Sequence, residues 1–195
     1  LIMLKLPDKF TSYLPLKVQE FLNDKRGVFA IDLAFAAPIL AGLMLGGVEV
    51  TRFVMLNQKI ERTSVTMADL VSQSETLTEG DLSGLFLATS GVMTPFDMDA
   101  NGKVIVSSVS TPSGGSPTIN WQRSYGSQTS SSTVGSEGGA AILPAGFELR
   151  ENESVIVAEV YYNFDPMVVN GVMDNHILYN RAIFRPRFGS LNTIN

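Results

Sequence analysis

VFAIDLAFAAPILAGLMLGGV, residues 28–48, is an apolar run whose only charged residue is Asp32. As an α-helix with a rise of about 1.5 Å per residue it measures about 31 Å, the thickness of the hydrocarbon core of a bilayer. Charged residues bracket the run on both sides, namely Lys25, Arg26, Glu49 and Arg52. A buried helix of a soluble protein seldom needs an apolar surface on every side over this length. The sequence therefore predicts a transmembrane helix over residues 28–50.

Basic residues set the expected orientation of this helix. Lys25 and Arg26 lie at its N-terminal edge, and the positive-inside rule places that edge in the cytoplasm. Basic residues that follow the run compete with them, namely Arg52, Lys59 and Arg62. The rest of the sequence holds no second apolar run long enough to span. We expect a single-pass membrane protein, with a cytoplasmic leader (residues 1–27) and an exported part (residues 51–195).

A cleavable secretory signal is the alternative interpretation of the apolar run. Residues 34–36 read Ala-Phe-Ala, a small-residue pattern typical of such cleavage sites. Too few apolar residues precede it, and the run continues well beyond it. In the leader, apolar residues at helical spacing fit a short amphipathic helix on the membrane surface, although a plain leader fits equally well. These residues are Phe10, Leu14, Val18, Phe21 and Leu22.

Composition narrows the classes of function. The net charge is −5 with scattered basic residues, which argues against nucleic acid as a partner. The sequence has no cysteine, which excludes disulfides and thiolate metal sites, and its single histidine, His176, excludes a histidine-rich metal site. No G-x-S-x-G elbow, phosphate-binding loop or dinucleotide fingerprint is present. We expect no catalytic residues, no cofactor and no enzymatic activity.

The exported part is predicted to begin with a stem that continues the transmembrane helix to about Ser72. Apolar residues recur there at spacings of three and four, namely Phe53, Leu56, Ile60, Thr63, Met67 and Leu70. We expect the stem to pack on the chain's own sheet, although a coiled-coil dimer would show the same spacing. A second helix begins at Thr78 or Asp81 and ends near Met93, with Leu82, Leu85, Phe86 and Met93 on one face.

Four strands follow in sequence. They are predicted at residues 104–110, 118–125, 154–164 and 176–186 from their β-branched and aromatic content. Successive strands of this kind indicate an antiparallel sheet packed against helices, an α+β fold. The Gly/Ser/Thr-rich stretches at residues 112–117 and 126–140 are expected to be mobile loops, serving as spacers or as contact surfaces.

Residues 97–102, DMDANG, match the first half of an EF-hand calcium loop. Asp97, Asp99 and Asn101 would be the ligands, but the twelfth position of the loop is Ser108 where the site needs glutamate. A turn built on Asn101 and Gly102 explains the same residues, so calcium is the weaker interpretation.

The remaining conspicuous side chains have ordinary structural interpretations. We expect His176 at the surface or at a strand end, and Trp121, Tyr161 and Tyr162 in the core or in cross-strand pairs. Three arginines near the C-terminal end form a basic strip that is either a solvated face or a contact for lipid or a partner, namely Arg181, Arg185 and Arg187.

The stretch around Gly27 resembles the processing site of type IV pilin-like proteins, with an acid at the fifth position after a glycine that follows basic residues. The resemblance implies that a prepilin peptidase cuts between Gly27 and Val28. Asp32 stands where the family usually has glutamate. A wider pattern is similar to the TadE/TadG-like proteins of the tight-adherence (Tad, Flp) pilus, and it is carried by Arg26, Gly27, Ala30, Asp32, Ala34, Ala37, Pro38, Ile39, Leu40, Glu49 and Phe53.

Residues of the apolar run have physical features that suit packing between subunits. A carboxylate in a bilayer costs up to about 3.5 kcal/mol and usually finds a partner, although Asp32 near the edge could also reach the interface alone. The resemblance implies that Asp32 pairs with the α-amine of Val28 after cleavage. Pro38 is tolerated in a membrane helix and suggests a kink. Gly42 and Gly46 form a GxxxG motif, which allows close helix approach.

These observations lead to two hypotheses. The resemblance implies a pilin-like minor subunit, anchored in the bacterial inner membrane, that assembles with other pilin-like subunits of a Tad pilus, with its head in the periplasm or on the pilus. The alternative is an envelope binding module or adhesin that keeps an uncleaved signal anchor.

Overall fold

The computed structural model describes residues 26–167 and 175–195. The chain divides into two units, residues 1–47 and 48–195, and each is described by itself. The leader helix expected before residue 26 lies outside the described residues. Helix α3 (Arg26–Ser72) contributes the described part of the first unit and the start of the second.

Helix α3 is the one helix of the described residues that is long and apolar enough to cross a membrane. Its large apolar side chains in the first unit are exposed in the isolated chain, with Phe29 74%, Phe35 72% and Met44 73% accessible. Apolar side chains exposed over this length are of the kind that a membrane helix would present to lipid. Pro38 lies inside the helix, and the kink expected there stays a prediction.

From residue 48 onward, α3 packs on the chain's own sheet. Leu56, Ile60 and Met67 are buried, and Thr63 lies on the same stripe. This confirms the packing that was favoured over a coiled-coil stem. The last apolar position of the predicted stripe is wrong, because Leu70 is 40% exposed while Val71 is fully buried in its place. The helix ends at Ser72, as predicted.

Helix α4 (Glu79–Met93) begins with a capping box. Thr78 accepts a hydrogen bond from the Asp81 backbone N–H at 3.1 Å, and the Asp81 carboxylate accepts one from the Thr78 backbone N–H at 3.1 Å. Two otherwise unpaired donors are thereby satisfied, which fixes where the helix starts. Of the two predicted start signals, Thr78 is the N-cap and Asp81 lies in the first turn.

The sheet contains four antiparallel strands in the order β2-β1-β3-β4. The strands are β1 (Gly102–Ser110), β2 (Thr118–Tyr125), β3 (Ser154–Phe164) and β4 (His176–Phe184). All four lie within two residues of the predicted bounds. The one-turn helix α5 (Met98–Asn101) precedes β1 and was not predicted.

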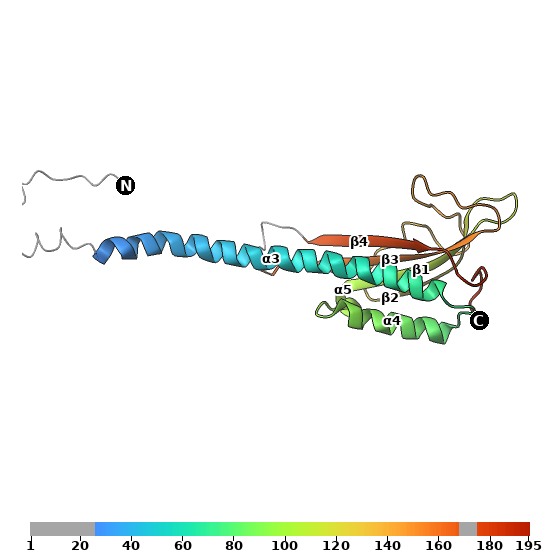
Figure 1. Ribbon diagram of the computed structural model, residues 1–195, viewed down its shortest axis with the longest axis horizontal. Coiled ribbons are helices and arrows are strands. Elements are labelled where there is room, and N and C mark those ends of the chain that lie inside the picture. The colour runs from blue at the N-terminus through green and yellow to red at the C-terminus, as the bar shows by residue number, and fades with distance from the viewer. Residues whose placement is uncertain (1–25, 168–174) are drawn as a thin grey trace, which may run out of the picture. The chain divides into compact units, whose positions relative to one another are not determined.

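The two faces of the sheet have different covers. Helices α3 and α4 pack on one face, the helix face, where side chains from all four strands join a single core that includes Val106, Trp121, Ile156 and Leu178 (Figure 1). The other face, the outer face, has a smaller core of β-strand and loop residues, including Val109, Ile119, Val134 and Val157. The architecture is therefore the predicted α+β arrangement, a long N-terminal helix on an antiparallel sheet.

A β-bulge in β2 decides which aromatic side chain faces the helices. Ser108 pairs with Trp121 and the next residue, Val109, pairs with Ile119, so Asn120 has no partner on β1. A bulge of this kind reverses the alternation of side chains along the strand. Trp121 consequently lies in the helix-face core and Ile119 in the outer-face core.

The long loop after β2 is not the mobile spacer expected from its composition. Val134 is fully buried, and Leu143 and Phe147 pack on the outer-face core. Lys103 on β1 donates from Nζ to the carbonyl oxygen of Ser130 at 2.8 Å. Glycine, serine and threonine suggested flexibility, but the apolar residues among them cover a sheet face that would otherwise contact water.

Residues after β4 close the end of the helical layer. The backbone N–H of Arg187 donates to the carbonyl oxygen of Ser72 at 2.8 Å, and Trp121 Nε1 donates to the carbonyl oxygen of Leu191 at 2.8 Å. Two arginines of the predicted basic strip form ion pairs within the chain, Arg185 with Glu153 at 3.2 Å and Arg187 with Asp69 at 2.8 Å.

Candidate assembly surfaces

The predicted packing residues of the apolar run all lie on α3. Asp32, Pro38 and Gly42 are exposed, and Gly46 is half-buried. A Cβ atom added to Gly27, Gly42 or Gly46 would meet no other atom within 4 Å. The GxxxG surface is therefore open in the isolated chain, and a second helix can approach its backbone closely.

Glu49 joins α3 to the chain that follows β3. Its side chain is 2% exposed, and its carboxylate lies 3.2 Å from Arg52 Nη1. The backbone N–H of Met167 donates to the second carboxylate oxygen at 3.2 Å. A buried carboxylate needs such partners, and each contact is charge-assisted.

Two phenylalanine rings add contacts beside Glu49, between α3 and the end of β3. The Phe53 and Phe164 rings meet edge to face with centroids 5.4 Å apart, and the Arg52 guanidinium lies 5.9 Å from the Phe164 centroid. The sequence indicated Glu49 as a charge that ends the apolar run and Phe53 as a position of the stem's apolar stripe, and both also belong to the TadE/TadG-like pattern. In the structure both side chains hold α3 to the end of β3 and the residues that follow it.

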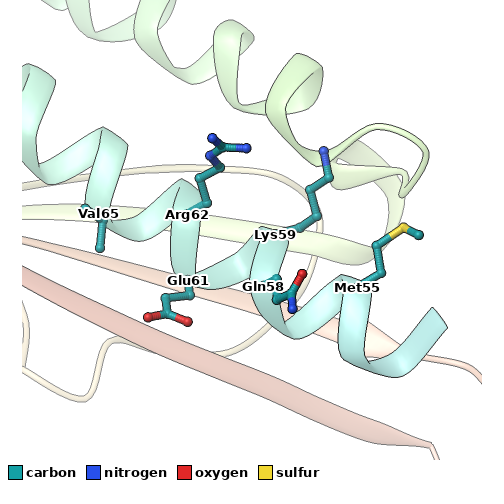
Figure 2. Close-up of a pocket in the computed structure, with 6 residues that line it drawn as sticks. All are labelled: Met55, Gln58, Lys59, Glu61, Arg62 and Val65. Atoms are coloured by element: carbon teal, nitrogen blue, oxygen red, sulfur yellow. The ribbon is translucent and has the colours of Figure 1, made fainter. Parts of the chain in front are cut away.

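A shallow groove of about 430 Å³ runs along the side of α3 that faces away from the sheet. Met55, Gln58 and Val65 form its apolar and polar floor (Figure 2). Lys59 and Arg62 point toward α4, and Glu61 points to the opposite side (Figure 2). Lys59 Nζ also donates to the carbonyl oxygen of Val92 at 2.8 Å.

The groove has the chemistry of a helix-packing surface. An apolar floor between charges of both signs suits a second amphipathic helix. The lysine and the glutamate among its residues, Lys59 and Glu61, point to opposite sides of the helix (Figure 2).

A buried carboxylate on the outer face was not predicted. Glu159 on β3 is fully buried, and it accepts hydrogen bonds from the Ser132 hydroxyl and from the backbone N–H of Thr133 at 3.0 Å. The Thr133 hydroxyl donates at 2.5 Å, the Tyr161 hydroxyl at 3.1 Å and the Tyr179 hydroxyl at 3.0 Å. No lysine or arginine of the described residues lies within ion-pair distance of it. Donors from the loop and from two strands thus solvate the charge in place of water.

Burial and the Glu159 carboxylate shift the pKa of the two tyrosines beside it. Burial raises the pKa of the Tyr161 hydroxyl, and the adjacent Glu159 charge raises the pKa further. Burial, followed by Glu159, also raises the pKa of Tyr179. Both phenols therefore remain donors at neutral pH, which keeps the cluster intact. The signal in the sequence is an acid inside the apolar run of β3, the same kind of signal that drew attention to Asp32.

The calcium candidate does not assemble. Asp97 caps α5 by accepting from the Ala100 backbone N–H at 3.0 Å, and Asp99 accepts from the Tyr125 hydroxyl at 2.6 Å and the Ser90 hydroxyl at 2.9 Å. In residues 26–167 and 175–195 no group of three or more His, Cys, Asp or Glu side chains is placed to hold a metal. The oxygens of Asp97 and Asp99 accept hydrogen bonds that cap α5 and join it to α4 and β2, so calcium stays the weaker interpretation of Asp97, Asp99 and Asn101.

The other predicted residues lie where expected. His176 is exposed at the first position of β4, and Trp121, Tyr161 and Tyr162 are buried. Tyr161 and Tyr162 face opposite sides of the sheet, where Tyr161 packs on Tyr179 at 4.9 Å and Tyr162 on Phe96 at 6.0 Å between centroids.

Comparison with protein-family models, curated proteins and solved structures gives no match.

Proposed function

We propose that the chain is a membrane-anchored, TadE/TadG-like minor pilin that assembles with other pilin-like subunits of a tight-adherence pilus. Its role is structural, not enzymatic. A single observation carries the proposal: α3 includes an apolar segment with an acid near its start and also forms the central helix of an α+β head.

In this proposal the apolar segment of α3 crosses the inner membrane, with the leader in the cytoplasm and the head in the periplasm or on the pilus. A prepilin peptidase cleaves between Gly27 and Val28. The new α-amine of Val28 lies one helical turn before Asp32, so the carboxylate can pair with that cation in its own chain or in a neighbour. Membrane lipid and neighbouring helices cover the exposed apolar side chains.

Two open surfaces of α3 support assembly through helices. The Gly42–Gly46 surface permits close approach of a second helix to the apolar segment, and the groove lined by Met55, Gln58 and Val65 offers a separate packing surface in the second unit. Helix packing is the function these two surfaces suit best.

Asp32 variants test the proposal in a bacterium that builds the pilus. Asp32→Ala should abolish co-purification of the chain with other pilin-like subunits from membranes, whereas Asp32→Glu should retain it because the charge is kept. Exposed Asp165, outside α3, provides the control variant Asp165→Ala. Equal co-purification of all three variants would contradict the proposal and favour an envelope binding module that keeps a plain signal anchor.

A further inference from the structure

The two edges of the sheet are protected to different degrees. The outer edge of β2 is covered by the chain's own loop, since Ile119 N–H donates to Gly139 O at 3.0 Å and Gly138 N–H donates to Ile119 O at 2.8 Å. Thr118 also forms a bridge with Ala140. Within the described residues, the backbone hydrogen bonds of β4 are those of its ladder with β3. The loop thus covers the β2 edge at Thr118 and Ile119, whereas among the described residues the outer edge of β4 has no backbone partner.

Apart from one charged side chain, Arg181, strand β4 lacks the features by which proteins usually block an open edge. Edge strands are commonly short or carry proline, lysine or a bulge. β4 is 9 residues long, reads HILYNRAIF, and keeps an unbroken register with β3. Ile177 is 53% exposed and Tyr179 40% exposed. An open edge of this length offers a row of backbone donors and acceptors to an extended chain.

Side chains along β4 define which extended chain fits. Alternation places Ile177, Tyr179, Arg181 and Ile183 on the outer face. Arg181 lies opposite Glu159 in the β3–β4 register, but the Glu159 carboxylate is taken by hydroxyl and N–H donors. Arg181 has no ion pair among the described residues. An incoming strand can therefore supply a carboxylate opposite this arginine.

We propose that the open edge of β4 binds an extended segment of a partner protein as a fifth strand, with an acidic residue opposite Arg181 and apolar residues two positions to either side of that acid. Backbone hydrogen bonds to β4 give affinity. The Arg181 guanidinium selects the acid, and the neighbouring Tyr179 and Ile183 side chains select the apolar residues.

A second copy of the chain suits this edge less well. β4 and the part of α3 from residue 48 run in the same direction (Figure 1). Antiparallel pairing of two β4 strands would therefore direct two α3 helices oppositely, whereas a separate segment can enter the edge in either direction.

Peptide binding to the full-length chain in detergent tests the proposal. The probe is a fluorescein-labelled heptapeptide of alternating valine and threonine, with glutamate at its centre in place of one valine, and its matched control carries lysine there. Fluorescence anisotropy should give a dissociation constant roughly two- to fivefold lower for the glutamate peptide. In Arg181→Gln, this preference should vanish while both peptides still bind.

Amide hydrogen exchange locates the binding site. The glutamate peptide should slow exchange along β4 and leave the loop-covered edge of β2 unchanged. Equal binding of both peptides to the unmodified chain, or protection at β2 in place of β4, would overturn the proposal. Because the chain has no cysteine, Ile177→Cys with Ile183→Cys tests self-pairing directly: in an antiparallel β4–β4 pair centred on residue 180, the cysteine at position 177 of one copy would lie opposite the cysteine at position 183 of the other. A β4–β4 disulfide dimer formed without detectable peptide binding would also overturn it.

Discussion

Thr133 donates two hydrogen bonds to the fully buried carboxylate of Glu159, from its backbone N–H at 3.0 Å and from its hydroxyl at 2.5 Å. These bonds fasten the serine- and threonine-rich loop to the centre of β3. With Val134 buried beside them, they make the loop part of the folded head. The hydrogen-bond cluster around Glu159, the polar lock, therefore covers part of the outer face of the sheet beside a small apolar core.

Glu159→Gln should lower the free energy of unfolding of the full chain by about 2–3 kcal/mol, because an uncharged amide replaces a charge-assisted acceptor and brings donors without partners. Urea unfolding followed by fluorescence of the single tryptophan, Trp121, measures this. The exposed Glu148→Gln is the matched control. If Glu159→Gln and Glu148→Gln unfold at the same urea concentration, the hydrogen bonds to Glu159 do not stabilise the fold.

Thr133→Val removes one hydroxyl donor and keeps the backbone N–H. The free energy of unfolding should fall by about 1–2 kcal/mol, less than for Glu159→Gln, because the other donors remain. Exposed Thr129→Val, in the same loop, should change it by less than about 0.5 kcal/mol. Equal losses for the two valine variants would assign the effect to the loop in general and contradict the specific contact.

The tyrosines of this lock predict a loss of stability in alkali. Folding raises the pKa of Tyr161 and Tyr179, chiefly through burial and then through Glu159. Their stabilising contribution is complete below about pH 10, where unfolded tyrosine is also protonated, and it falls as pH rises above that value. Unfolding at a series of pH values, with Tyr179→Phe for comparison, should show a smaller alkaline loss in the variant. Identical alkaline profiles would contradict this assignment.

Helix α4 provides an independent test at its capping box. Thr78→Ala should lower the free energy of unfolding by about 1 kcal/mol, because the Asp81 N–H loses its acceptor. Exposed Thr76→Ala, two residues earlier, serves as the control. A Thr78→Ala variant as stable as Thr76→Ala would show that the cap contributes nothing.

Asp81 makes the same cap sensitive to acid. Hydrogen bonds from Thr78 lower the pKa of the Asp81 carboxyl below its ordinary value. Its contribution is present above about pH 4 and is lost as pH falls through the lowered pKa. Asp81→Asn should therefore be less stable than the unmodified chain at neutral pH, and the difference should shrink in acid. A difference that stays constant with pH would contradict the ionic part of the cap.

Sequence patterns predicted the elements of this fold because each element carries its own local signal. The 3–4 spacing of Leu56, Ile60 and Met67 predicted the stem, and Thr78 predicted the start of α4. Two strands, 118–125 and 154–164, were predicted to the residue. Local propensity and burial agree along these segments, which is why they can be read from sequence.

Features that depend on distant residues could not be predicted. The bulge at Asn120 depends on the register with β1, and the folding of the loop depends on Glu159, which lies on another strand. Asp97 and Asn101 looked like calcium ligands because the spacing of oxygens is shared by cation loops and by helix caps. Only the contacts of α5 with neighbouring elements distinguish a helix cap from a cation-binding loop.

The GxxxG surface predicts weaker association of α3 helices when its glycines are replaced. Gly42→Ile with Gly46→Ile should weaken self-association in detergent by about 1 kcal/mol, measured by energy transfer between labelled chains, because the helix backbones are held apart. Leu43→Ile, on the same segment, should leave it unchanged. Unchanged transfer for the glycine variant would exclude this surface from the contact.

The mature N-terminus tests the central claim most directly. The chain should be expressed in a bacterium with a prepilin peptidase, purified from membranes, and analysed by N-terminal sequencing and intact mass. A pilin-like subunit should begin at Val28, and Gly27→Leu should block that cleavage. A chain that retains Gly27 and the residues before it, in the presence of active peptidase, would contradict the account.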